Sequence, residues 1–401
     1  MVLSILDVRS LLMPFALYLL GLAVFAQGTS EFMLSGLVAD IAADLHVSIP
    51  AAGMLTSAFA AGMVLGAPVM ALLSLRLSRR GALVGFLSAF IVVHVLGAVI
   101  TSFGLLLLTR VAAALANAGF WAVALAAANA MVRPELRGRA TSIVVSGVTV
   151  ACVAGVPAGA LLGQYWGWRS AFWAVAAVSL PALFAILRTI PGGRSGTAET
   201  GARKELRVLR EPRLLVVLLL GALVNGGTFG TFTYLAPLFT TAGGLDAGWV
   251  PALLAIFGVG SFAGVTLGGR LADRRPGVVL FGGSAALLLG WALLAVTAAN
   301  LVVAVALVFV LGVLSFGVGS TLIPRVFAEA PGAPTLAGGL GTAAFNVGAV
   351  LGPWLGGLAV GGDLGFRAAP WVSAALVALA LVLAVATQRN RAGTPGHHVE
   401  V

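Results

Sequence analysis

Long apolar runs separated by short polar turns dominate the sequence. A run of about 20 apolar residues is long enough to cross the hydrocarbon core of a bilayer as an α-helix. The pattern predicts twelve such spans and therefore an all-α membrane protein. In the first half of the chain the spans cover roughly residues 12–36, 49–74, 82–101, 104–132, 140–162 and 170–188. In the second half they cover roughly residues 214–240, 250–269, 277–298, 301–323, 337–360 and 368–387.

The longest polar interruption lies in the middle of the chain. It is rich in Gly, Ser, Thr and Arg, and it holds the one lysine of the sequence, Lys204. A solvated, basic stretch of this kind is typical of a linker between two membrane domains. We expect four parts: an N-terminal six-helix bundle over 1–190, a cytoplasmic basic linker over 191–213, a C-terminal six-helix bundle over 214–390 and a polar tail over 391–401.

Composition agrees with the hydropathy pattern. Hydrophobic residues make up 60% of the 401 residues and charged residues only 9%, against about a quarter charged in soluble domains. So few charges exclude soluble globular, disordered and coiled-coil proteins together. The net charge of +10 does not indicate a nucleic-acid partner, because the basic residues lie at the ends of apolar runs and not in one patch.

The distribution of these basic residues predicts the orientation. Twenty of the 23 arginines and lysines fall in the termini, the central linker and the loops on one side of the predicted membrane. The loops on the other side hold only Arg169 and Arg367, and Arg110 lies within a span. Because cytoplasmic loops carry the excess of Arg and Lys, we expect both termini to be cytoplasmic.

The two halves of the chain repeat each other. The segment Gly167–Trp173 reappears as Gly365–Trp371 at an offset of 198 residues. Two prolines, Pro157 in the fifth span and Pro353 in the eleventh, lie 196 residues apart. A duplication of six spans with both termini on one side predicts two pseudo-symmetric six-helix bundles that meet at a central cavity, which is the architecture of a transporter.

Two cytoplasmic turns, each following the second span of its half, resemble the major facilitator superfamily. In that family the turn usually reads Gly-x-x-x-Asp-Arg-x-Gly-Arg-Arg. The first copy is degenerate, because Ala71 and Leu75 replace the glycine and the aspartate, but it keeps Arg76, Arg79 and Arg80. The second copy keeps Gly269, Asp273 and Arg274. Such turns contribute to topology and contact anionic lipids, and the resemblance implies that Asp273 with its arginines acts as a cytoplasmic latch.

The fifth span carries a further signature. Gly147, followed by Gly155-Val156-Pro157-Ala158-Gly159, is similar to the glycine–proline motif of drug:proton antiporters in this superfamily. The resemblance implies efflux, with Gly147, Gly155, Pro157 and Gly159 acting in the conformational change. Close helix packing by small residues and a proline kink would explain the same residues, so both interpretations remain open.

The first and fourth spans resemble the branch of the superfamily that contains the actinobacterial chloramphenicol efflux proteins. The resemblance is carried by the segments Phe25–Met33 and Arg110–Phe120. It implies export of chloramphenicol or a related hydrophobic drug from the cytoplasm of a bacterium, across its inner membrane. A proton gradient would supply the energy without a cofactor, and we expect a monomer whose partners are the drug, protons and the lipid bilayer.

Glu31 and Arg110 are the candidate proton-coupling residues. Of the acidic residues, Glu31 alone lies well inside a predicted span, and of the basic residues the same is true of Arg110. Each lies about six residues from the outer end of its helix, so both are predicted ~9 Å below the outer surface. An ionisable residue inside the membrane is costly unless it is paired or faces water, and is a functional candidate by default. We expect Glu31 to exchange a proton for the substrate while Arg110 orients it. A static ion pair, or a Glu31 side chain that reaches the outer surface, is the alternative.

Amides and aromatic rings at helical spacing are the candidates for the substrate cavity. Asn117 and Trp121 share a face with Arg110, and Gln27 lies one turn before Glu31. The second half contributes Asn225, Phe229, Phe232 and Asn346. Amides beside aromatic rings suit a neutral, partly polar aromatic ligand. Hydrogen bonds between helices and contacts with lipid are the alternative roles.

No other chemistry is predicted. The adjacent His397 and His398 are too close and too isolated for a metal site. The sequence has no glycine-rich phosphate loop with lysine and no nucleophile–base pattern, so we expect neither ATP hydrolysis nor an enzyme. An exporter of sugars or endogenous metabolites on the same fold is the first alternative function. A passive channel is the second, although the sequence has no repeated selectivity-filter segment.

Overall fold

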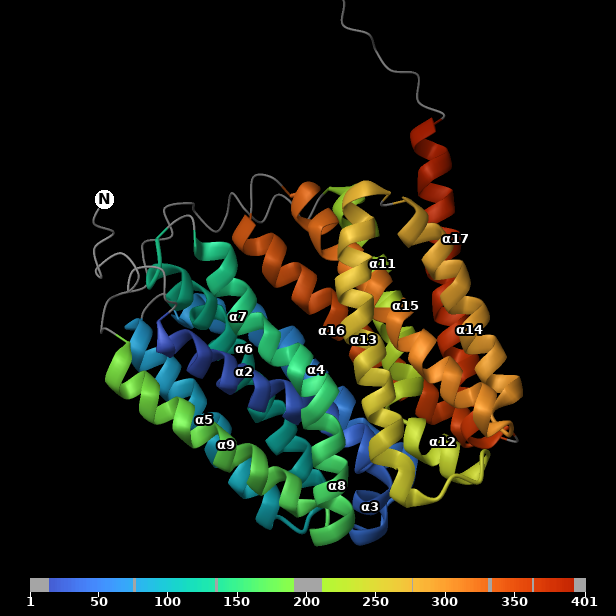
Figure 1. The fold of residues 1–401 in the computed structure, drawn as a ribbon, viewed down its shortest axis with the longest axis horizontal. Coiled ribbons are helices and arrows are strands. Elements are labelled where there is room, and N and C mark those ends of the chain that lie inside the picture. Colours follow the sequence, from blue (N-terminus) through green and yellow to red (C-terminus); the bar gives the residue numbers. More distant parts are fainter. Residues whose placement is uncertain are drawn as a thin grey trace, which may run out of the picture. The chain divides into compact units, whose positions relative to one another are not determined.

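The computed structural model describes residues 14–74, 77–133, 136–190, 211–275, 277–330, 334–362 and 364–392. The described chain is helical and contains no sheet (Figure 1). Among the described residues, twelve segments are long and apolar enough to cross a membrane, which confirms the twelve predicted spans. These segments cover residues 15–36, 49–67, 79–99, 103–130, 139–166, 169–189, 212–232, 247–268, 278–297, 301–328, 337–360 and 365–388.

The chain divides into two compact units. The first takes in the described residues of 1–201 together with 245–258, and the second takes in those of 202–244 and 259–401. The helices of the first half are α2 (Phe15–Phe32), α3 (Val38–Asp44), α4 (Ile49–Ser74), α5 (Arg79–Val99), α6 (Phe103–Ala130), α7 (Arg137–Val150), α8 (Val156–Trp166) and α9 (Arg169–Thr189). Those of the second half are α11 (Pro212–Phe232), α12 (Leu235–Thr241), α13 (Val250–Arg274), α14 (Gly283–Thr297), α15 (Leu301–Ala328), α16 (Pro334–Val360) and α17 (Ala368–Ala392).

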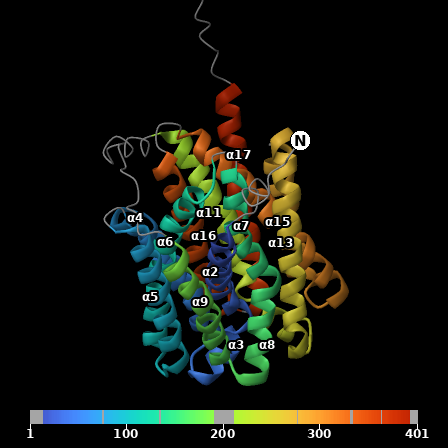
Figure 2. The same ribbon diagram turned by 60° about the vertical axis from the view of Figure 1, so that its left-hand side comes forward.

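Helix α2 lies in the core of the first unit. Twelve of its 18 residues are buried, including the polar Gln27 and Ser30, because other helices pack against it. It contacts α7 and α9, while α5 and α9 run side by side in both views (Figure 1, Figure 2). These outer helices expose apolar side chains such as Val92 and Phe184, as expected for surfaces that face lipid.

Small residues bring α2 and α7 into backbone contact. A Cβ atom added to Gly147 would collide with the carbonyl oxygen of Gly21 and lie 2.8 Å from the backbone nitrogen of Phe25. One added to Gly155 would collide with the Thr29 hydroxyl. Glycine is therefore required at these positions for packing, which supports the structural interpretation of the fifth-span motif without testing the functional one.

The second unit repeats this contact between α11 and α16. A Cβ atom on Gly348 would collide with the carbonyl oxygen of Ala222, and one on Gly352 with that of Gly226. The first and fifth spans of each half thus pack against each other through glycines that allow their backbones to touch. This agrees with a duplicated architecture.

Several spans are less regular than hydropathy predicts: the ninth begins with a π-helical turn, Val278–Gly282, and three others are interrupted. The first ends its α-helix at Phe32 and continues as a 3₁₀ turn, Met33–Gly36, before α3. The run predicted as one span over 214–240 consists of two helices, because α11 ends at Phe232 and α12 begins at Leu235. The fifth span contains a π-helical turn, Ala151–Gly155, which ends two residues before Pro157. Apolar residues continue through all three interruptions, so hydropathy alone could not locate them.

The repeated turn at the start of the sixth and twelfth spans has a shared backbone feature. Gly167 has φ +79° and Gly365 has φ +54°, a region that other residues rarely enter. Both glycines therefore allow the chain to reverse before α9 and α17. The structural equivalence supports the 198-residue repeat identified from sequence.

Candidate functional site

The candidate coupling residues lie in the first unit, on α2 and α6. Arg110 is 1% exposed, whereas Glu31 is half-buried in the last turn of α2. The Arg110 guanidinium donates from Nη1 to Ser30 Oγ at 2.9 Å and from Nη2 to the Ser30 carbonyl at 2.7 Å. It therefore binds the residue next to Glu31, and it interacts electrostatically with Glu31 itself. Among the described residues no ion pair within 4.0 Å joins the two side chains.

Aromatic rings surround the guanidinium. The Phe59 ring of α4 lies 4.6 Å from Arg110 Cζ, and the Phe172 ring of α9 lies 5.9 Å from it. Cation–π attraction of this kind helps to stabilise a desolvated charge. Arg110 Nε is buried and has no hydrogen-bond partner in the part of the chain that the structure describes.

Sequence reasoning missed the other partner of Ser30, which is His94 of α5. His94 is 1% exposed, and its Nε2 lies 2.6 Å from Ser30 Oγ. Its Nδ1 lies 2.7 Å from the carbonyl oxygen of Phe90 on the same helix. In the sequence His94 stands alone within the third predicted span, without a recognisable partner. A histidine inside a predicted span was nevertheless a signal of a polar neighbour on another helix.

The polar residues predicted for the cavity of the first half have different surroundings. Gln27 is fully buried, and neither of its amide atoms has a hydrogen-bond partner among the described residues. Asn117 donates to the Met63 sulfur at 3.5 Å, while its Oδ1 is buried without a partner there. Trp121 is half-buried. Buried amide atoms without partners are rare and point to water or to a ligand.

The predicted residues of the second half lie on α11 and α16. Asn225 Nδ2 donates to the Phe345 carbonyl of α16 at 2.7 Å, which is the helix-to-helix bond considered as its alternative role. The rings of Phe229 and Phe232 are buried and meet edge to face, with centroids 6.1 Å apart. Asn346 donates within its own helix to the Thr342 carbonyl at 2.9 Å.

The basic turns are only partly covered by the structure. Arg79 and Arg80 begin α5, which Ser78 caps by accepting a hydrogen bond from the Gly81 amide at 3.1 Å. Arg76 lies outside the described residues, and so do the side chains of the second turn, Gly269, Asp273 and Arg274. The latch predicted from these turns therefore stays a prediction.

At the predicted outer end of the first unit, Asp44 is the centre of a polar cluster. Its Oδ2 is 2.6 Å from Arg169 Nη1 and accepts a hydrogen bond from Trp168 Nε1 at 3.2 Å. The bond from Arg169 lowers the pKa of the Asp44 carboxyl. Burial instead raises the pKa of Asp40, which lines a cavity of about 910 Å³ together with Asp44.

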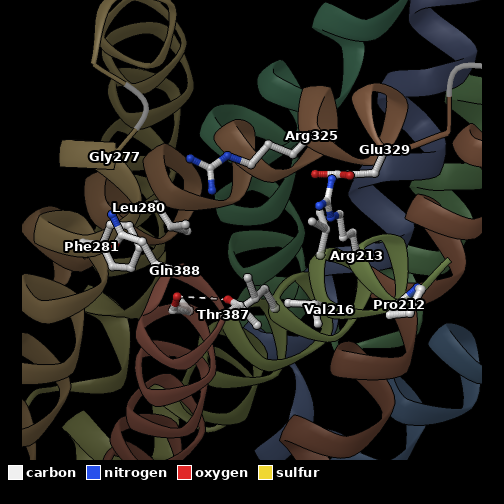
Figure 3. Close-up of a pocket in the computed structure, with 13 residues that line it drawn as sticks. Pro212, Arg213, Val216, Gly277, Leu280, Phe281, Arg325, Glu329, Thr387 and Gln388 are labelled. Atoms are coloured by element: carbon white, nitrogen blue, oxygen red, sulfur yellow. Dashed lines mark hydrogen bonds between the residues drawn. The ribbon is translucent and has the colours of Figure 1, made fainter. Parts of the chain in front are cut away.

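The second unit contains a separate cavity of about 750 Å³ that sequence reasoning did not anticipate. Its walls come from α11, α15, α17 and the π-helical turn Val278–Gly282 that precedes α14, and they include the apolar Val216, Leu280 and Phe281. Figure 3 shows Arg325 extending over the cavity, while the Arg213 guanidinium and the Glu329 carboxylate point toward each other. None of the predicted site residues lines it.

Metal chemistry receives no support from the described residues. They contain no group of three or more His, Cys, Asp or Glu side chains that could hold an ion. The polar groups that the structure does bring together in the first unit are suited to proton exchange and to hydrogen bonding with a neutral ligand.

Curated relatives match nearly the whole chain. A chloramphenicol resistance protein of Streptomyces lividans is 54% identical over 375 residues, which cover 93% of this chain and 96% of the relative. The inner membrane transport protein YdhP of Escherichia coli is 34% identical over 95% of this chain and 97% of its own length. The first match confirms the resemblance to the chloramphenicol branch.

Solved transporters share the fold at low sequence identity. A bacterial homologue of the human lysosomal transporter Spinster, inward-facing and unoccupied, superposes with a TM-score of 0.75 at 18% identity, covering 93% of this chain and 96% of its own. The nucleoside transporter NupG superposes with a TM-score of 0.75 at 14% identity, and the match covers 93% of this chain and 98% of NupG. The family model described as Major Facilitator Superfamily matches residues 20–335. The chain is a multi-pass membrane transporter that belongs to the major facilitator superfamily.

Proposed function

We propose that this protein exports chloramphenicol or related hydrophobic drugs across a bacterial inner membrane in exchange for protons, by alternating access. The observation that carries the proposal is the half-buried Glu31, which lies beside the buried Arg110–Ser30 pair. The 54% identity to a chloramphenicol resistance protein supports the substrate class. No cofactor is required, because the proton gradient supplies the energy.

Glu31 carries the exchanged proton in this proposal. Burial favours the neutral acid, while the nearby Arg110 favours the carboxylate, and a change in access to water shifts the balance between these two effects. In the cytoplasm-facing state an ionised Glu31 accompanies drug binding. In the outward-facing state a proton from outside neutralises Glu31, and the drug is released.

The buried amides supply the recognition. Gln27 lies one turn from Glu31, and its two amide atoms have no partner among the described residues. Asn117 likewise offers an unpaired Oδ1. A neutral ligand with hydroxyl or amide groups could satisfy both residues, and a charged ligand would gain less from them.

The exchange of a neutral drug for a proton moves net charge. The membrane potential should therefore contribute to drug export together with ΔpH. Transport that responds to ΔpH but not to membrane potential would contradict a neutral substrate with this coupling.

The test is chloramphenicol accumulation in inside-out membrane vesicles that are acidified inside. We expect uphill, uncoupler-sensitive accumulation by the wild type, and its loss in Glu31→Gln. Glu211→Gln is the matched control, because Glu211 is exposed at the start of α11 and its side chain makes no capping bond.

Each other outcome excludes part of the proposal. Uphill accumulation by Glu31→Gln under ΔpH alone would refute the coupling role. Downhill equilibration without accumulation would favour a passive channel. No movement of chloramphenicol by folded wild type would transfer the substrate assignment to sugars or endogenous metabolites, which a substrate panel would then identify.

A further inference from the structure

His94 of α5 is a buried titratable group to which the proposed exchange gives no role. Both ring nitrogens have partners at short distances, Phe90 O at 2.7 Å from Nδ1 and Ser30 Oγ at 2.6 Å from Nε2. A carbonyl oxygen only accepts hydrogen bonds, so Nδ1 carries the proton. The neutral ring therefore presents the lone pair of Nε2 to the Ser30 hydroxyl.

This tautomer determines the direction of the whole network. Ser30 donates its hydroxyl proton to His94 Nε2, which leaves the Ser30 Oγ lone pairs to accept from Arg110 Nη1 at 2.9 Å. Hydrogen bonds thus run in one direction from Arg110 through Ser30 and His94 to the Phe90 carbonyl. A chain with a uniform direction is cooperative, since each bond polarises the next.

The surroundings of His94 oppose its protonation. The Phe90 and Phe172 rings lie with centroids 4.1 Å and 5.9 Å from the imidazole. The charged group that acts on His94 is Arg110 of α6, with Ser30 between them, and Glu31 of α2 lies on the far side of Ser30. Helix α9 presents the apolar Phe172 to the ring, while its arginines, Arg169 and Arg188, lie at the two ends of that helix. A second positive charge beside Arg110 would be repelled, so the ring remains neutral and acts as a fixed acceptor.

We propose that His94 is a positioning residue for the Glu31 site. By fixing the Ser30 hydroxyl, it holds the Arg110 guanidinium on Ser30, one residue away from Glu31, and keeps it from forming a direct ion pair with the Glu31 carboxylate. A direct pair would stabilise the ionised acid and make it harder to protonate. The inference extends the proposed function, because it assigns the group that keeps Glu31 able to change charge.

The matched variants are His94→Asn and His94→Gln. The Asn side chain can reach the Phe90 carbonyl in the position of Nδ1, but it is too short to reach Ser30. The Gln side chain places an amide oxygen near the position of Nε2 and can accept from Ser30. Ser30→Ala removes the same hydrogen bond from the other end. It is expected to have the same effect as His94→Asn, and it replaces that variant in the test if His94→Asn does not fold.

The primary readout is independent of the substrate. Infrared titration of the purified protein, with the Glu31→Gln spectrum subtracted, isolates the Glu31 carboxyl band. We expect its midpoint to fall by about one pH unit in His94→Asn and Ser30→Ala, the equivalent of one hydrogen bond to a charged group. We expect His94→Gln to restore the midpoint of the wild type. A role in packing alone would lower thermal stability without moving this midpoint.

The second readout connects the inference to transport. In acidified inside-out vesicles, half-maximal chloramphenicol uptake by His94→Asn should require about tenfold more protons than uptake by His94→Gln. Identical infrared midpoints in all folded variants, or equal shifts in His94→Asn and His94→Gln, would overturn the positioning role. If the wild type does not transport chloramphenicol, the proposed function fails while the infrared titration still decides the role of His94.

Discussion

Replacing Gly147 by alanine adds one methyl group to the contact between α2 and α7. That methyl carbon would collide with the Gly21 carbonyl oxygen and lie 2.8 Å from the backbone nitrogen of Phe25. Backbone atoms cannot rotate away as a side chain can, so the two helices must separate. Gly85 on α5 is the matched control, because a Cβ atom there meets nothing within 4 Å.

The expected size of the effect follows from two opposing contributions. Alanine favours a helix over glycine by up to about 1 kcal/mol. Overpacking of a close contact costs about 1–3 kcal/mol, and a rigid backbone contact belongs at the upper end. Gly147→Ala should therefore lose about 2 kcal/mol, whereas Gly85→Ala should gain up to about 1 kcal/mol. The difference of about 3 kcal/mol corresponds to about 6–12 °C in Tm for a unit of this size.

The single cysteine of the chain provides the assay. Cys152 is half-buried within the π-helical turn of the fifth span, so a thiol-reactive fluorophore reports when that region opens. We expect the labelling midpoint of detergent-purified Gly147→Ala to lie below that of both the wild type and Gly85→Ala. Midpoints of the two variants that agree within about 2 °C would show that α2 and α7 are not in backbone contact, and would refute the reasoning.

Three further changes test other contacts. Arg169→Ala removes the partly exposed ion pair with Asp44 and should lower stability by about 0.5–1 kcal/mol. Because Arg169 lowers the pKa of Asp44, this loss of stability is present at neutral pH and disappears as the pH falls through that lowered pKa. A Tm difference between wild type and variant that grows on acidification would contradict this explanation. Asn225→Ala leaves the Phe345 carbonyl without its bond and should cost about 1 kcal/mol, measured as a lower Tm than that of the wild type. Gln27→Leu removes two buried, unpartnered amide atoms and should raise Tm while it raises the KM for drug; an unchanged KM would argue against a role in the cavity.

Hydropathy predicted the twelve spans because each one satisfies the bilayer independently of its neighbours. It could not predict where a span bends. The residues around Met33 and Thr233 are as apolar as those before them, so the 3₁₀ turn and the break between α11 and α12 leave no mark in the pattern. The repeat at Gly167 and Gly365 was more informative, because both glycines adopt the positive φ that such a turn needs.

The sequence predicted how deep the site residues lie in the membrane, but not how each helix is rotated about its own axis. Counting residues from the helix ends placed Glu31 and Arg110 at the same level, and the structure brings Arg110 to the residue beside Glu31. The rotation of each helix about its axis depends on packing with the others. The sequence therefore could not show that Arg110 binds Ser30, or that His94 completes the network from a third helix.

The π-helical turn at Ala151–Gly155 accommodates one residue more than a regular α-helix would over the same length. In an uninterrupted α-helix, Gly159 would lie about 120° around the axis from Gly147; with one extra residue absorbed, the offset falls to roughly 20°. The extra residue therefore keeps Gly147, Gly155 and Gly159 on the face toward the first span, where they meet Gly21, Thr29 and Met33. Deletion of a single residue from the turn would leave composition and hydropathy almost unchanged, yet it would rotate Pro157 and all of α8 away from the helix that carries Glu31.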